Sequence, residues 1–307
     1  MGNLDLAVRA CTAVIGRDKR AGWAYHNRGR AYLGKGDHDR AIADITKAID
    51  INPRIATAYL HRGSAYLRKG DRDRAIADYS KAIDVDPRYA DAYANRGSAY
   101  LGKGDRERAI ADYSKAIDLD PRNASAYANR ATVYFHKGEH DRAIADYSNA
   151  IDLDPRNTTT YANRAAASFR KGDHDRAIAD LTQVIDLDPR NAIAYNNRGS
   201  AYLGRGDHDR AIADHSKAID LDPRSAIAYN NRAWAYFKAG KAAQGLPDVE
   251  HSLQLSPDNA AALDTRGHIF EALGRREEAI ADFRRALSID PSIQETREAL
   301  QRLGVAP

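Results

Sequence analysis

The chain has 307 residues, with 47 Lys and Arg against 43 Asp and Glu, so its formal charge of +4 is a small difference between two large totals. The two signs are interspersed, whereas a nucleic-acid-binding protein gathers its positive surplus in a patch or stripe. A single cysteine, Cys11, excludes an internal disulfide. No run of apolar residues is long enough for a membrane-spanning helix.

The first residues lead directly into a helical pattern, with no apolar signal segment before it. Together with the single cysteine, this start favours a reduced, cytoplasmic setting, and the alternative is an exported protein from which a signal segment has been removed. An amphipathic helix is predicted by the spacing of Ala7, Val8, Val14 and Ile15. We expect residues 3–21 to form the second helix of a repeat that lacks its first helix.

From residue 22 to residue 293 the sequence repeats itself every 34 residues, eight times in succession. A proline marks the period at Pro53, Pro87, Pro121, Pro155, Pro189, Pro223, Pro257 and Pro291. A glycine follows the same period at Gly36, Gly70, Gly104, Gly138, Gly172, Gly206, Gly240 and Gly274. Self-similarity at a fixed period of this length indicates a solenoid, in which stacked copies share one continuous core.

Each repeat has the pattern of two helices joined by a short turn, as the third repeat illustrates. A first helix is predicted over 91–103 by the spacing of Tyr93, Gly97, Tyr100 and Leu101. Gly104 ends this helix, because glycine tolerates the left-handed backbone of a helix C-terminus. Asp105 caps a second helix that runs to about Leu119 and stops before Pro121.

Small residues recur at one position of each helix and predict a close approach of the two backbones. In the first helices they are Gly29, Gly63, Gly97, Ala131, Ala165, Gly199, Ala233 and Gly267. In the second helices they are Ala41, Ala75, Ala109, Ala143, Ala177, Ala211, Gly245 and Ala279. Glycine is a poorer helix former than alanine by ~1 kcal/mol. The seventh repeat departs most from the others, and although Pro247 is tolerable in the first turn of its expected second helix, Gly245 is not favoured there. We therefore predict that the seventh repeat is the softest joint of the array.

The fourth repeat contains the runs AYANR, KG, RAIADY and DP at residues 126–130, 137–138, 142–147 and 154–155. These runs resemble the tetratricopeptide repeat, and the resemblance covers residues 22–293. It implies an all-α, right-handed α-solenoid superhelix of stacked antiparallel helix pairs. Its first helices would line a concave groove that binds extended peptides or partner helices. Residues 294–307 are then expected to form a C-terminal capping helix and tail.

An arginine stands in every repeat where the family pattern usually has leucine, at a place between the two helices: Arg28, Arg62, Arg96, Arg130, Arg164, Arg198, Arg232 and Arg266. A buried unpaired charge is costly, so each guanidinium needs a partner. An aspartate has the same period: Asp44, Asp78, Asp112, Asp146, Asp180, Asp214, Asp248 and Asp282. We predict structural ion pairs between the two sets, within one repeat or between neighbours. The alternative is an arginine row that grips an acidic ligand.

The resemblance also implies that one position of each first helix hydrogen-bonds the backbone of a bound peptide. That position carries Asn27, Asn95, Asn129, Asn163, Asn197 and Asn231, with His61 and Thr265 in the second and eighth repeats. We call these residues the amide row. An amide both donates and accepts, so it can satisfy a peptide backbone of any sequence. The alternative is that the asparagines tie neighbouring helices together.

The other groove positions carry mostly small or neutral side chains, and the Lys and Arg clamp of chaperone-binding relatives is not visible. The larger exceptions are Trp23, His26, Arg30, Trp234 and His268. Trp and Arg are frequent hot-spot residues, so we expect Trp23, Arg30 and Trp234 to contribute affinity. For Trp23, covering the end of the core is an equally good interpretation.

Histidines such as His38, between Asp37 and Asp39, stand at helix starts. Stacked helices lie ~8–10 Å apart, too far for copies in adjacent repeats to share one zinc ion. We therefore expect solvated histidines, no metal site and no cofactor. No phosphate-binding glycine loop and no nucleophile motif is present, so we expect no catalytic residues and no enzyme.

The sequence thus predicts a scaffold or adaptor that binds a protein or peptide segment in the concave groove, with no nucleic-acid partner. One alternative is a nucleic-acid-binding helical repeat, although such arrays vary the side chains at their reading positions. The other is a self-assembling array that forms homo-oligomers through its terminal helices.

Overall fold

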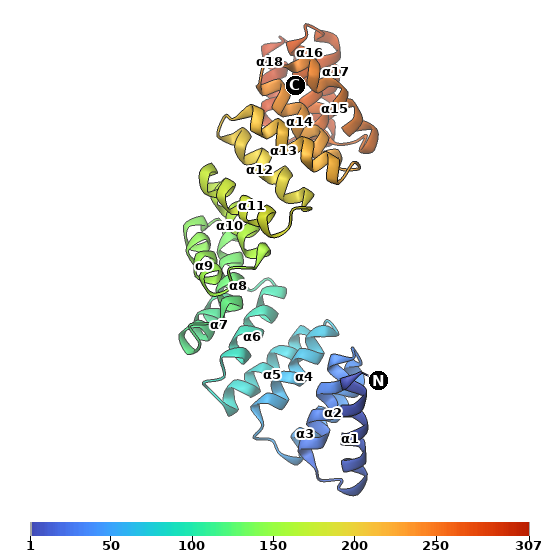
Figure 1. Cartoon of the computed structure of the whole chain (residues 1–307), viewed down its shortest axis with the longest axis vertical. Helices are drawn as coiled ribbons and strands as arrows, with labels where there is room; N and C mark the ends of the chain where they lie inside the picture. Colours follow the sequence, from blue (N-terminus) through green and yellow to red (C-terminus); the bar gives the residue numbers. More distant parts are fainter. Residues whose placement is uncertain (1, 307) are drawn as a thin grey trace. The chain divides into compact units, whose positions relative to one another are not determined.

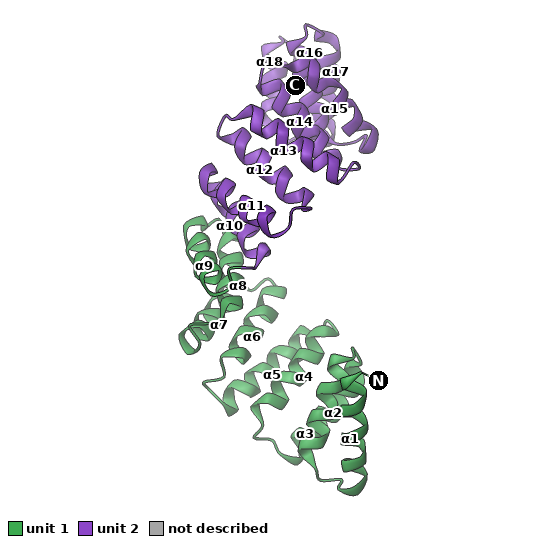
Figure 2. Ribbon diagram, viewed as in Figure 1, with its two compact units in different colours: residues 1–155 green, residues 156–307 purple. Residues whose placement is uncertain are grey.

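A computed structural model describes residues 2–306 of the chain (Figure 1). Within that range it contains eighteen α-helices and no strand, which confirms the all-α class of stacked helix pairs. The chain divides into two compact units, residues 1–155 and residues 156–307 (Figure 2). Between residues 2 and 306, no helix combines the length and apolar character needed to cross a membrane.

In unit 1, each helix packs against the next one along the chain. Its helices are α1 (Asn3–Arg17), α2 (Gly22–Gly34), α3 (His38–Ile51), α4 (Ala56–Arg68), α5 (Arg72–Val85), α6 (Ala90–Gly102), α7 (Arg106–Leu119), α8 (Ala124–His136) and α9 (His140–Leu153). From α2 on, the even-numbered helices are the first helices of repeats 1–4 and the odd-numbered ones are the second helices. The contacts are most extensive between the two helices of one repeat.

Unit 2 continues the same order through repeats 5–8. Its helices are α10 (Thr158–Lys171), α11 (His174–Leu187), α12 (Ala192–Gly204), α13 (His208–Leu221), α14 (Ala226–Lys238), α15 (Ala242–Leu255), α16 (Ala260–Ala272), α17 (Arg276–Ile289) and α18 (Gln294–Arg302). At its C-terminal end α18 packs on α17, with Leu300 buried against Phe270 and Phe283.

The turn between the two helices of a repeat is built around one glycine and one aspartate. In repeat 3, Gly104 has a φ of +81°. The N–H groups of Gly104 and Asp105 donate to the carbonyls of Leu101 and Tyr100 at 2.9 and 3.0 Å. The Asp105 carboxylate then accepts from the N–H of Arg108 and caps α7. Both predicted roles are confirmed, and they explain why so short a turn suffices.

Small residues stand where the two helices of a repeat approach most closely. In repeat 2, a Cβ added to Gly63 would lie 2.8 Å from the Tyr79 ring and 3.2 Å from the Ala75 carbonyl oxygen. The large side chains of the second helices fill the space beside these contacts, as Tyr79 does while almost fully buried. Close packing therefore depends on the small residues that the sequence repeats.

Repeat 7 reverses the usual arrangement, with alanine on the first helix and glycine on the second. A Cβ added to Gly245 would lie 2.8 Å from the carbonyl oxygen of Ala233. Helix α15 continues through Pro247 without a break. Propensity alone suggested that Gly245 weakens the repeat, but the structure shows that it also permits a helix contact in which alanine would not fit.

The histidines at the starts of second helices are not the solvated groups that we expected. The ring of His174 packs against Phe169, with centroids 5.2 Å apart, and against Gly204 of the next first helix. His140 packs in the same way against Phe135. In the part of the chain that the structure describes, the buried Nδ1 atoms of these two rings have no hydrogen-bond partner. The flanking acidic residues had suggested that these histidines are exposed. Their rings instead pack against the phenylalanine of the preceding helix.

Candidate functional site

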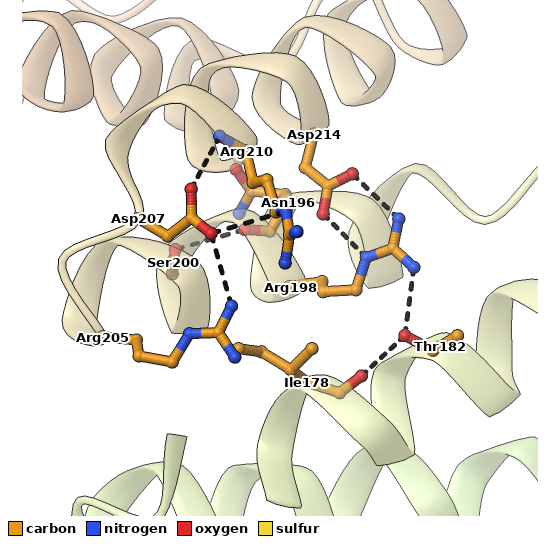
Figure 3. A network of polar contacts seen from close by, with 9 residues as sticks. All are labelled: Ile178, Thr182, Asn196, Arg198, Ser200, Arg205, Asp207, Arg210 and Asp214. Atoms are coloured by element: carbon orange, nitrogen blue, oxygen red, sulfur yellow. Dashed lines mark hydrogen bonds and ion pairs between the residues drawn. The ribbon is translucent and has the colours of Figure 1, made fainter. Parts of the chain in front are cut away.

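A bidentate ion pair joins the two helices of every repeat. In repeat 6, Arg198 on α12 donates from Nε and Nη2 to the carboxylate of Asp214 on α13, at 2.7 and 2.9 Å (Figure 3). The other pairs are Arg28–Asp44, Arg62–Asp78, Arg96–Asp112, Arg130–Asp146, Arg164–Asp180, Arg232–Asp248 and Arg266–Asp282. Each arginine thus pairs within its own repeat.

These ion pairs are largely shielded from solvent. The side chains of Arg130 and Asp146 are 18% and 8% exposed. The pKa of Arg130 is raised, chiefly by the hydrogen bond that it donates to Asp146 and against the opposing effect of desolvation. Since Nε and Nη2 are both occupied by an internal carboxylate, the geometry favours an architectural role over the gripping of an acidic ligand.

The remaining donor of the arginine reaches the preceding repeat, a contact that the sequence analysis missed. Nη1 of Arg198 donates to Oγ1 of Thr182 on α11 at 3.1 Å (Figure 3). The same contact joins Arg28 to Thr12, Arg62 to Thr46, Arg96 to Ser80, Arg130 to Ser114 and Arg232 to Ser216. A hydroxyl residue sixteen positions before the arginine was the available signal. Thr12 lies on α1, so this contact joins α1 to the first repeat.

Most members of the amide row have no internal partner. Within residues 2–306, no hydrogen bond to another residue is formed by the side chains of Asn27, Asn95, Asn129, Asn163 and Asn197. In repeats 4 and 6 the first helix of the preceding repeat offers the asparagine no polar partner, at the residue that stands 35 positions before it. It is Ala94 before Asn129 and Ala162 before Asn197, and an alanine cannot hydrogen-bond. These amides keep their donors and acceptors for water or a ligand.

Two members of the amide row are tied to the neighbouring first helix. Nδ1 of His61 lies 2.9 Å from Nε2 of His26, and Nδ2 of Asn231 donates to Oδ1 of Asn196 at 3.1 Å. Thr265 is buried and bonds to its own helix. The helix-tying interpretation therefore applies at His61 and Asn231, whereas peptide binding by the unbonded amides stays a prediction.

Burial changes the titration of the histidine pair. It lowers the pKa of His61 to about 4, and the nearby charges of His26 and Arg30 act in the same direction. Burial also lowers the pKa of His26. The pair is therefore neutral near pH 7, and the guanidinium of Arg30 lies close enough to act on both rings.

The larger side chains stand on α2 of unit 1 and on α14 and α16 of unit 2. Trp23 on α2 is 58% exposed, and Arg30 on the same helix is also exposed. Trp234 on α14 is half-buried, with its ring 5.0 Å from Phe237 and 5.6 Å from His268. His268 is only 8% exposed, so its grouping with the groove side chains was wrong. Its ring is enclosed by aromatic neighbours that lie far away in the sequence.

Family models match most of the chain. The model of the ETO1 C-terminal domain matches residues 122–305. Models of the tetratricopeptide repeat match residues 22–55, 63–104 and 99–138. A search among curated proteins found no match.

Solved structures of tetratricopeptide repeat proteins share the fold. One from Parabacteroides merdae is 23% identical, with a TM-score of 0.63 over 81% of this chain and 98% of that one. YrrB, described as a TPR protein with an unusual peptide-binding site, is 26% identical over 60% of this chain and 95% of its own, with a TM-score of 0.55. MamA is 30% identical over 53% of this chain and 96% of its own, with a TM-score of 0.51.

Since these models together cover residues 22–55 and 63–305 and the helix pairs stack as described, the chain belongs to the tetratricopeptide repeat family, with residues 122–305 in the family of the ETO1 C-terminal domain.

Proposed function

We propose that the chain is a non-catalytic scaffold that binds an extended peptide segment of a protein partner along its first helices. Proteins with the tetratricopeptide repeat fold generally mediate protein–protein interaction. The observation that carries the finer proposal is the set of unbonded amides in the amide row, at Asn27, Asn95, Asn129, Asn163 and Asn197. An extended peptide has one donor and one acceptor per residue, which such amides can satisfy.

Two further observations support a peptide over other ligands. The arginine row uses its donors inside the protein, so the repeats do not offer a line of free guanidinium groups to phosphates. The description of YrrB names a peptide-binding site on a similar fold. Trp23, Arg30 and Trp234 are the side chains that we propose to add affinity beside the amides.

The test uses random peptides of roughly twelve residues, displayed on phage and selected on the full chain. Kd values of the selected peptides are then compared between the wild type and an Asn163→Ala/Asn197→Ala double variant, whose two positions both lie in unit 2. Loss of two backbone hydrogen bonds, at about 1 kcal/mol each, should weaken binding roughly tenfold or more. Asn149→Ala, which removes an exposed amide from a second helix, is the matched control and should change nothing.

The outcomes separate the candidate functions. If the chain retains no peptide and binds a labelled single-stranded oligonucleotide in a salt-dependent way, a nucleic-acid-binding function replaces the proposal. Equal Kd values for the wild type and the double variant would remove the amide row from the binding surface. Light scattering over a concentration series shows whether the chain instead binds copies of itself.

A further inference from the structure

A tyrosine closes the space between the two helices in repeats 2, 3 and 4. In repeat 4 it is Tyr147 of α9, which is almost fully buried and whose hydroxyl lies 3.0 Å from Oγ1 of Thr132 on α8. In repeat 3 the hydroxyl of Tyr113 lies 3.0 Å from Oγ of Ser98. A long ring and a short hydroxyl side chain together fill this place.

Repeat 5 has neither the tyrosine nor the hydroxyl side chain. Leu181 stands in place of the tyrosine and Ala166 in place of the hydroxyl residue. A pocket of about 340 Å³ opens there between α10, α11 and α12, and both residues line it. Its volume is at the low end of the ~300–1,000 Å³ that is usual for ligand sites. The pocket lies where repeat 5 has only Ala166 and Leu181 at these two positions, and its lining lies wholly within unit 2.

The rim of the pocket combines an apolar, an amide and a cationic side chain. Phe169 is 38% exposed, and Arg170 and Asn197 complete the rim. Ile193, four residues before Asn197 on the same face of α12, is an apolar side chain that is 72% exposed. Large apolar side chains with so much exposure, next to an apolar pocket, mark an interaction surface.

The charge on this surface has one sign. Helices α10, α12 and α14 contain no Asp or Glu. Arg170 forms no ion pair within the described part of the chain, whereas Arg164 on the same helix is paired with Asp180. A cation without a partner at the rim of an apolar pocket complements a ligand that carries a carboxylate beside an apolar group.

We propose that this pocket holds one large aliphatic or aromatic side chain of a bound peptide. Asn197 hydrogen-bonds the peptide backbone beside that anchor, and Arg170 pairs with an Asp or Glu one or two residues away from it. The ligand is thus an acidic peptide with an apolar anchor. This inference rests on the proposed peptide-binding function and adds the site and chemistry of the ligand.

The decisive variant fills the pocket with side chains that the array already uses. Ala166→Thr combined with Leu181→Tyr gives repeat 5 the Thr and Tyr pair of repeat 4, where Thr132 and Tyr147 pack beside Ala131. This precedent indicates that the variant folds, and circular dichroism checks that it does. Ala166→Met, whose flexible side chain reaches into the pocket, is a second way to fill it. The control is Ala179→Thr, at an exposed position of α11.

The probe is the displayed library of random peptides, selected on the wild-type full chain. We expect the selected peptides to share a large apolar residue with Asp or Glu close by. Filling the pocket should raise their Kd roughly tenfold or more, because the anchor loses its burial. The control variant should bind as the wild type does. In Arg170→Gln, selection should keep the apolar residue and lose the acidic one.

Each contrary result has a distinct meaning. Peptides that bind the filled variants and the wild type equally would overturn the pocket while leaving the peptide-binding function intact. A selected set with apolar anchors but no acidic preference would overturn the role of Arg170. If the wild type retains no peptide at all, the proposed function and this inference both fail.

Discussion

Replacement of His215 by tyrosine should remove most of the acid sensitivity of repeat 6. His215 occupies the place of Tyr113 in repeat 3 and is fully buried. Its Nδ1 lies 3.1 Å from Oδ1 of Asn196, which also accepts from Asn231. Since an amide oxygen only accepts, Nδ1 carries the proton and Nε2 is bare. Within residues 2–306 the buried Nε2 has no partner, so protonation there has no compensation.

The magnitude follows from the pKa of this ring. Burial, aided by the charge of Arg232, lowers the pKa of His215 from 6.5 to about 4. Below about pH 6.5 the unfolded chain takes up a proton that the folded chain refuses, so stability is lost as the pH falls towards 4. Between these two pKa values the loss is about 2 kcal/mol at about pH 5 and approaches ~3 kcal/mol at lower pH.

The assay is urea unfolding of the wild type and His215→Tyr at about pH 7.5 and about pH 5, followed by circular dichroism. Because repeat arrays can unfold in parts, hydrogen exchange of α12 and α13 supplements the global curves. Gly199 and Ser200 match Gly97 and Ser98 of repeat 3, so the tyrosine has a fitting site. The variant should lose clearly less stability on acidification. An equal loss in both proteins would refute the reasoning, and Tyr113→His should create the same sensitivity in repeat 3.

Three further substitutions test the packing. Asp146→Ala leaves Arg130 buried without its partner and should cost ~3–5 kcal/mol in urea unfolding, whereas Arg130→Leu with Asp146→Leu should be nearly neutral. Gly245→Ala should destabilise by ~1–3 kcal/mol despite its better helix propensity, because its Cβ meets the Ala233 carbonyl oxygen; an unchanged or raised melting temperature would contradict this. Burial raises the pKa of Asp264, so the ionised carboxylate destabilises the folded chain at neutral pH. Asp264→Asn should therefore raise the free energy of unfolding at neutral pH, by an amount that shrinks in acid, where Asp264 becomes protonated. A difference between the two proteins that is constant across pH would contradict the raised pKa.

Much of the architecture could be predicted because one repeat constrains all the others. The fixed period located the helices, and Gly104 and Asp105 identified the turn by residue type alone. The pairing of Arg96 with Asp112 was inferred because two charges with one period must satisfy each other when buried. Local chemistry and repetition were enough for these features.

The features that the sequence did not predict depend on contacts between neighbouring helices and repeats. The hydroxyl of Thr182 has the same period as Arg198, and sequence spacing does not tell whether such residues meet within a repeat or across its border. His268 resembled a groove residue until its aromatic neighbours from two other helices were in view. The pocket beside Leu181 is a missing volume, which becomes visible only when the neighbouring helices are in place.

The contact from an arginine to a hydroxyl of the preceding repeat, formed by Arg28, Arg62, Arg96, Arg130, Arg198 and Arg232, makes the borders at these repeats self-complementary. Donor and acceptor occupy the same two positions in successive copies, as with Arg62 and Thr46 or Arg96 and Ser80. A repeat with both residues can therefore be duplicated or deleted by recombination, and the arginine that follows it still finds a hydroxyl acceptor. Such an array is free to change length in steps of one repeat, while the first-helix surfaces diverge independently towards new ligands.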